Sequence, residues 1–244
     1  YKRQIQVSGK IKIANIEANW TVADSTNSND DWYAYKDNSG TKAQVNVPKL
    51  ADGMTAIKYS TDSDLTAGSK WANAMTKDGS MWVWIPRFNA VTPSNYNGGT
   101  KAKPNAIDVT FVKSNETAID AFTFGDKELS GFWYGKFEVG GTLVSACTNE
   151  TCNVSNIAVK PNVTSLRRQT VSSFFYASRS MEQANNSFGF VSTEVNTHMS
   201  KNNEWGAVAY LAHSKYGLNG DEIGINTNSR YKTGIGNNGG SAYN

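Results

Sequence analysis

Apolar residues recur at alternate positions over much of the first half of the chain, which is the period of a strand with one buried face. The opening segment shows this spacing for the most part, at Ile5, Val7, Ile11, Ile13 and Ile16. We therefore expect residues 1–50 to form an N-terminal β-strand extension. The domain that follows is predicted to cover residues 51–244 and to end in a Gly- and Asn-rich tail.

Further strands are predicted in the middle of the chain. The segment 81–88, MWVWIPRF, is its most hydrophobic strand candidate, and Pro86 should mark the end of the strand or an edge position. Shorter strands are expected at 56–59, 107–112 and 132–139. The last of these precedes Gly140 and Gly141, which we interpret as a hairpin turn.

Helical spacing appears only late in the sequence. The first predicted helix follows Thr170 as its N-cap and presents an apolar face of Val171, Phe174, Phe175 and Ser178. The second is expected to start at a cap formed by Asn196 or Thr197 and to stop at Gly217. Its apolar face would consist of Trp205, Val208, Ala209 and Ala212. Two helices within a strand-rich chain predict an α+β class.

The amino-acid composition indicates where the protein is located. The 244 residues are 39% hydrophobic, enough for a core, but only 18% are charged, and Asn, Ser, Thr and Gly are plentiful. This surface of neutral amides and hydroxyls is common in extracellular proteins. The net charge of +3 and the scattered lysines argue against a nucleic-acid partner. The sequence has no membrane-spanning apolar run and no signal peptide, although a processed chain would lack the latter.

The two cysteines, Cys147 and Cys152, enclose a short segment rich in turn-forming residues. This spacing favours a loop closed by one disulfide over free thiols, and two ligands without a nearby histidine are too few for a zinc site. A disulfide would place the protein in an oxidising, extracellular compartment.

Three segments carry a family resemblance: 81–88 (MWVWIPRF), 131–139 (GFWYGKFEV) and 202–210 (NNEWGAVAY). Their order and separation resemble those of Firmicute and phage surface proteins related to the formylglycine-generating-enzyme (sulfatase-modifying factor) family. The resemblance covers roughly residues 80–217 and implies a C-type-lectin-like fold, with a twisted antiparallel sheet, two helices and long loops.

The departures from the family pattern concern catalysis. Family members carry their catalytic cysteines and a closing Trp-Glu strand after the second helix, where this sequence has neither Cys nor Trp beyond Trp205. The pair Cys147 and Cys152 precedes both helices, so the family's oxidative chemistry does not transfer to it. We expect no enzyme activity; a related oxidase would need a copper-binding thiol pair or a histidine-based iron site.

Other candidate sites have competing interpretations. His198 and His213 would lie on one predicted helix, roughly 22 Å apart, too far to act as a pair. Asp221, Glu222 and Asn226 offer oxygen ligands for calcium in the loop where lectin-like folds often hold it, but no complete calcium-loop pattern is present, which favours a solvated loop and no cofactor.

The aromatic residues fall into two groups. Trp82, Trp84 and Trp133 belong to the predicted strands, and core packing is the favoured interpretation. The candidates for an exposed contact surface lie outside the matched region and are Trp20, Trp32, Tyr33 and Tyr35.

These observations predict a non-enzymatic extracellular protein, a subunit of a bacterial surface filament, a pilus or a phage tail. A lectin-like sheet without its closing strands would expose an unpaired edge, which a strand from a neighbouring copy could cover, with residues 4–22 as the donor. The alternative is an adhesin module that binds carbohydrate or a host receptor through its long loops. Self-association is the expected partnership under the first hypothesis.

Overall fold

The structure, a computed structural model, describes residues 3–6, 10–13, 16–22, 48–59, 72–94, 105–113, 115–143, 147–152, 156–167 and 169–220. The chain forms two compact units, residues 1–89 with 110–207 and residues 90–109 with 208–244. The described elements include strands and two α-helices, which confirms the predicted α+β class.

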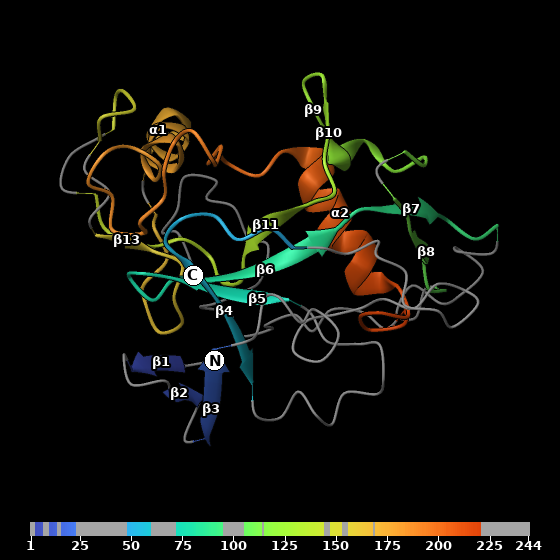
Figure 1. Ribbon diagram of the computed structural model, residues 1–244, viewed down its shortest axis with the longest axis horizontal. Helices are drawn as coiled ribbons and strands as arrows, with labels where there is room; N and C mark the ends of the chain where they lie inside the picture. Colours follow the sequence, from blue (N-terminus) through green and yellow to red (C-terminus); the bar gives the residue numbers. More distant parts are fainter. Residues whose placement is uncertain are drawn as a thin grey trace, which may run out of the picture. The chain divides into compact units, whose positions relative to one another are not determined.

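A seven-stranded antiparallel sheet dominates the first unit (Figure 1). Its strands lie in the order β1-β2-β3-β4-β5-β6-β11. Their bounds are β1 Arg3–Gln6, β2 Lys10–Ile13, β3 Ile16–Val22, β4 Met54–Tyr59, β5 Asn73–Thr76, β6 Met81–Pro86 and β11 Gly131–Gly135. Strand β3 pairs with β4, with Val22 opposite Ile57, so the N-terminal strands continue the sheet of the following domain.

The predicted strand 81–88 divides at Arg87. Pro86 is the last residue of β6, as its missing N–H predicts, and Phe88–Val91 forms β7, which pairs with β8 (Asp108–Phe111). The two other small sheets pair β9 (Thr123–Phe124) with β10 (Lys127–Glu128), and β12 (Gly140–Gly141) with β13 (Ile157–Ala158). A short 3-10 helix, Asp120–Phe122, precedes β9.

The predicted turn at Gly140 and Gly141 is wrong, because both residues are paired strand residues. Gly141 has a φ of 111°, and a Cβ atom there would overlap the carbonyl oxygen of Asn156. The glycine is required for the close approach of β13. Strand β11 is also shorter than the predicted 132–139 and ends at Gly135.

Helix α1 (Val171–Ser180) begins where the sequence predicted, and the Thr170 side chain accepts a hydrogen bond from the Ser173 N–H at 3.2 Å. Its predicted buried face is wrong. Val171 is 75% exposed and Phe175 45% exposed, whereas Ser173, Ala177 and Ser180 are buried. Small side chains on this face let the helix pack closely.

Helix α2 (Asn202–His213) begins later than predicted. Asn196 and Thr197 do not cap it, because other side chains hold them: Arg179 Nη1 donates to Asn196 Oδ1, and Glu182 accepts from the Thr197 N–H. The helix also ends before Gly217. Its predicted face is wrong as well, since Trp205 is 65% exposed while the buried positions are Glu204, Ala207 and Leu211.

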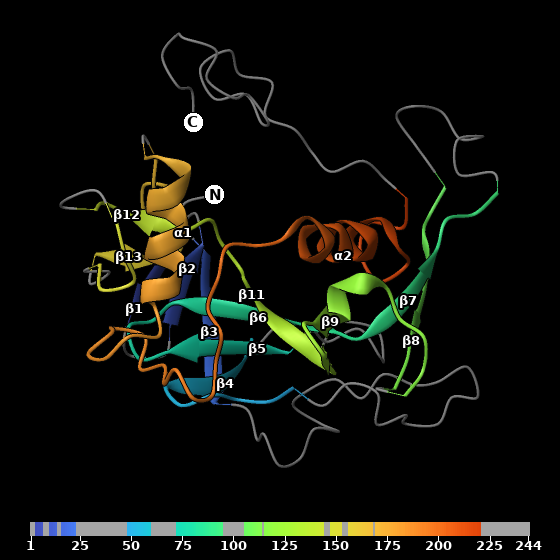
Figure 2. The ribbon, with the colours of Figure 1, turned by 90° about the horizontal axis from the view of Figure 1, so that it is seen from above.

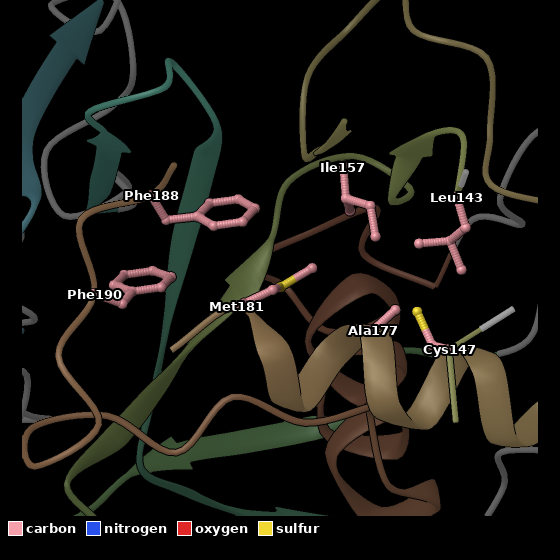
Figure 3. Packing of buried hydrophobic residues seen from close by; sticks show 7 residues of the cluster. All are labelled: Leu143, Cys147, Ile157, Ala177, Met181, Phe188 and Phe190. Carbon is pink, nitrogen blue, oxygen red and sulfur yellow. The ribbon is translucent and has the colours of Figure 1, made fainter. Parts of the chain in front are cut away.

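The first unit has a core packed against α1, seen from close by in Figure 3. Ala177 and Met181 come from α1 and the turn after it, and Phe188 stacks on Phe190 with the ring centroids 5.7 Å apart. Trp82 of β6 packs edge-on against both phenylalanine rings. The remaining members of the cluster are Leu143, Cys147 and Ile157.

In the second unit, the Ile107 N–H donates to the carbonyl oxygen of His213 at 3.1 Å, and Ile107 forms a parallel bridge with Ser214. Ile107, Val109, Leu211 and Ser214 are buried.

Candidate functional site

Strand β11 is the last strand of the seven-stranded sheet and pairs only with β6 within the part of the chain that the structure describes (Figure 2). The Arg87 N–H donates to the carbonyl oxygen of Ser130 and the Lys136 N–H to that of Met81, each at 3.0 Å. Antiparallel pairing alternates, so the peptide groups of Gly131 and Gly135 point away from β6.

Glycine and tryptophan set the position of this edge. A Cβ atom on Gly131 would overlap the indole ring of Trp84, which is 4% exposed. The Trp84 and Trp133 rings meet edge-on with their centroids 5.3 Å apart, and Trp133 Nε1 donates to the carbonyl oxygen of Lys49 at 2.7 Å. The packing of these indoles fixes β11 against β6, as expected for core tryptophans.

The two flanking side chains of β11 contact the rest of the unit. The Phe132 ring lies 5.6 Å from that of Phe122, and the Tyr134 hydroxyl donates to Ser200 Oγ at 3.1 Å. Tyr134 thereby links the edge strand to the connection between α1 and α2.

A charged cluster lies where that connection meets α2 and consists of His198 and Glu204. His198 Nε2 lies 3.0 Å from Glu204 Oε1, and His198 Nδ1 lies 2.8 Å from the carbonyl oxygen of Asn196. The hydrogen bond to Glu204 raises the pKa of His198 above its ordinary value, against the opposing effect of burial. The pKa of Glu204 is lowered: burial acts to raise it, but hydrogen bonds from His198 and from the Lys201 N–H outweigh that effect.

The side chains of His198 and Glu204 are both largely shielded from solvent. The side chain of Glu204 is 7% exposed and that of His198 is 24% exposed. Sequence reasoning placed His198 on the same helix as His213, which is wrong because His198 precedes the first turn of α2. The only signal for the pair was the glutamate three residues after Lys201, the spacing of a capping box.

A second charged group surrounds Arg87, whose side chain is 5% exposed. Its guanidinium donates to three backbone carbonyls, those of Lys113, Leu129 and Glu116, and lies 2.5 Å from Glu128 Oε2. This salt bridge lowers the pKa of Glu128. An open hollow of about 350 Å³ adjoins the group and is lined by Arg87, Asn115, Glu116, Thr117, Ala118, Thr123 and Glu128.

Cys147 and Cys152 form the predicted disulfide, with their Cα atoms 5.3 Å apart. Asn149 Oδ1 accepts from the Thr151 N–H at 3.0 Å and shapes the turn between them. The loop lies against α1: Ser180 Oγ is 2.8 Å from the carbonyl oxygen of Glu150 and 2.7 Å from that of Tyr176 in its own helix, and its one proton is shared between them.

The structure leaves the other predicted site residues untested. Of the proposed contact surface, Trp20 lies in β3, where only its backbone is described, and Trp32, Tyr33 and Tyr35 lie outside the described residues. The calcium candidates Asp221, Glu222 and Asn226 also lie outside them and stay a prediction. Among the residues that the structure does describe, no three His, Cys, Asp or Glu side chains form a group that could hold a metal ion.

Comparison with known proteins gives no relative: no protein-family model, curated protein or solved structure matches the chain significantly. Within the described ranges, neither helix has the length and apolar character that crossing a membrane requires.

Proposed function

We propose that this chain is a non-enzymatic extracellular protein, a subunit of a surface filament, pilus or phage tail that joins further copies by strand addition. The observation that carries the proposal is the β11 edge, where Gly131 and Gly135 direct peptide groups away from the sheet. Among the described strands β11 has a neighbour on one side only, and the edge of a sheet can be a template for another strand, whose main-chain hydrogen bonds supply affinity. A C-type-lectin-like arrangement of the sheet and the two helices belongs to the same proposal.

The order of the strands supports an assembly that continues. Among the described strands, β1 and β11 are the two ends of one sheet. The stretch 4–22 expected to donate a strand includes β3, which pairs with β4 of its own chain, and β1, which has β2 as its neighbour. Strand β1 of one copy is therefore the proposed donor to β11 of the next. A contact between two different edges produces a filament when the rotation between successive copies does not close, and a ring when it does; the proposal is the filament.

The disulfide supports the extracellular part of the proposal. Cys147 is 3% exposed and its bond to Cys152 closes a loop on α1. Disulfides persist where the surroundings are oxidising, as outside the cell.

The experiment compares two substitutions at one position. A proline at Gly135 removes the outward N–H but leaves pairing with β6 intact, whereas Gly135→Ala keeps the N–H and brings the same Cβ, 3.1 Å from Val159 Cγ1. Light scattering should show assemblies for the parent chain and for Gly135→Ala. Gly135→Pro, and a chain without residues 1–22, should give much smaller particles.

A monodisperse monomer for the parent chain, unchanged by either alteration, would contradict the proposal.

The alternative function, binding of a glycan or receptor, has one observation in its favour. The hollow beside Arg87 is lined by hydrogen-bonding side chains such as Asn115 and Thr117, which suit a hydroxylated ligand. A glycan array without hits, with and without calcium, would count against it.

A further inference from the structure

The connection between α1 and α2, residues 181–201, carries no regular secondary structure. Two buried carboxylates hold its second half. Glu182 accepts from the Thr197 N–H, and Glu204 accepts from the Lys201 N–H at 2.8 Å. His198 lies between these two anchored points, and its ring supplies the contacts that join them, to the Asn196 carbonyl oxygen and to the Glu204 carboxylate.

The partners of the imidazole define its protonation. The Asn196 carbonyl oxygen, 2.8 Å from His198 Nδ1, can only accept a hydrogen bond. The carboxylate of Glu204, 3.0 and 3.2 Å from Nε2, accepts as well, and its Oε2 already receives the Lys201 N–H. Both ring nitrogens must therefore donate, which only the imidazolium cation does.

Every element packed against the ring contributes to its surroundings. Phe124 of β9 places its ring centroid 5.3 Å from that of His198, and the same phenyl ring carries Lys201 Nζ at 3.8 Å. Lys201 Nζ also lies 3.5 Å from Glu204 Oε1 and opposes the charge on His198. From α1, Arg179 donates to Asn196 Oδ1 and pairs with Glu182 at 2.9 Å.

Loss of one proton from His198 would remove one of the two hydrogen bonds that its ring donates. The neutral ring has a single N–H, so it can donate to the Asn196 carbonyl oxygen or to the Glu204 carboxylate but not to both, and its other nitrogen then presents a lone pair to an acceptor. A donor contact becomes a repulsion between two acceptors. Glu204 retains the Lys201 N–H and ammonium, so the helix start stays capped while one of the two contacts of His198 is lost.

We infer that His198 and Glu204 form a proton-controlled latch on residues 196–201, closed while the imidazole is protonated and released as it loses its proton. Release frees the segment that contacts β11 through Ser200 and Tyr134 and β9 through Phe124. The latch stands on the contacts within the first unit and does not depend on the proposed assembly.

The first test is a proton NMR titration of the full chain. The sequence has two histidines, so His213→Gln assigns the two imidazole signals. We expect His198 to titrate above its ordinary value of 6.5 in the parent chain. In Glu204→Gln, whose amide no longer carries the negative charge, its pKa should fall, whereas in Glu128→Gln, a carboxylate paired with Arg87 instead, it should not move.

The second test is amide hydrogen exchange of residues 196–201 across the same pH range, corrected for the intrinsic effect of pH. Protection should fall as the pH passes the measured His198 pKa, by about tenfold for each unit that this pKa exceeds 6.5. The non-titrating variant His198→Gln should show exchange without this step, and Glu128→Gln should keep it.

Titration of His198 at or below 6.5, or protection of residues 196–201 that does not change with pH, would overturn the latch. Should Glu204→Gln fail to fold, the parent chain and His198→Gln decide the question by the same two measurements.

Discussion

The buried pair of His198 and Glu204 makes the stability of the fold depend on pH in both directions. The pKa of His198 is raised, so its stabilisation is fully present below 6.5 and is lost as the pH rises through its folded pKa. The pKa of Glu204 is lowered, so its stabilisation is present above 4.5 and is lost as the pH falls through its folded pKa.

We therefore predict that the contribution of this pair to the free energy of unfolding is greatest in the mildly acidic range between these limits. Urea unfolding across the pH range checks this. His198→Gln and Glu204→Gln should flatten the alkaline loss, by about 1.4 kcal/mol for each unit of the measured His198 shift. A parent chain whose stability rises steadily from pH 6 to pH 8 would contradict the prediction.

Arg87 is the other residue on which local structure depends. Its guanidinium holds three carbonyls of two separate segments, and its side chain is 5% exposed. Arg87→Lys keeps the charge but lacks the planar fork that reaches them. We expect it to lower the free energy of unfolding by on the order of 3 kcal/mol, because carbonyls and a charge stay buried without partners.

The matched control is Glu128→Gln, which removes the ion pair and leaves the carbonyl contacts of Arg87 in place. Glu128 is 48% exposed, so water screens the pair and the loss should be small. Equal losses in the two variants, measured by denaturant unfolding, would show that the salt bridge and not the carbonyl contacts stabilises this region.

At the scale of elements, the disulfide loop and α1 stabilise each other. Ser173 and Ser180 of α1 donate to the carbonyl oxygens of Cys147 and Glu150. The chain-entropy model gives about 2 kcal/mol for so short a loop, to which the lost packing of buried Cys147 adds. The double variant Cys147→Ala, Cys152→Ala should unfold at correspondingly lower denaturant concentration.

Reductant supplies the control for that experiment. It should lower the midpoint of the parent chain toward that of the double variant and leave the double variant unchanged. A parent chain indifferent to reductant, with both thiols shown to be reduced, would mean that the hydrogen bonds to α1 hold the loop without the bond between the cysteines.

The elements also show how far sequence reasoning reached. The spacing predicted both helices and the strand of Trp82 and Trp84, because period and cap residues are local features. The buried faces were missed, since Ser173 and Ala177 pack closely where Val171 and Phe175 do not. A prediction from hydrophobicity places large apolar side chains on the buried face, whereas a helix that packs closely buries small ones.

The candidate site was less accessible to sequence reasoning than the elements. The strand that became β11 was predicted, but its place at the end of the sheet follows from pairings with distant residues such as Trp84 and Ile85. The contact of His198 with Glu204 depends on α2 beginning at Asn202 and not at a cap several residues earlier. Arg179 and Glu182 bind Asn196 and Thr197 ahead of that start, and both come from the α1 end of the connection, far from α2 in the sequence.

For the whole molecule, strand direction distinguishes two assemblies. Successive neighbours in the seven-stranded sheet are antiparallel, so β1 and β11 run the same way. Copies related by translation would pair β1 with β11 in parallel and grow without limit. A two-fold axis would instead pair β11 with β11 antiparallel and close at a dimer. We predict the open form, because it satisfies both edges of every interior copy, whereas the dimer leaves each β1 uncovered.

Light scattering over a range of concentrations separates the two forms. In the open assembly the average mass keeps rising with concentration, and removal of residues 1–9, which contain β1, abolishes the rise. In the closed one the mass reaches a plateau at twice that of the chain, and the same truncation leaves it unchanged. Gly135→Pro should weaken either form, since both use the outward peptide groups of β11, so the truncation is the measurement that identifies which strand is the partner.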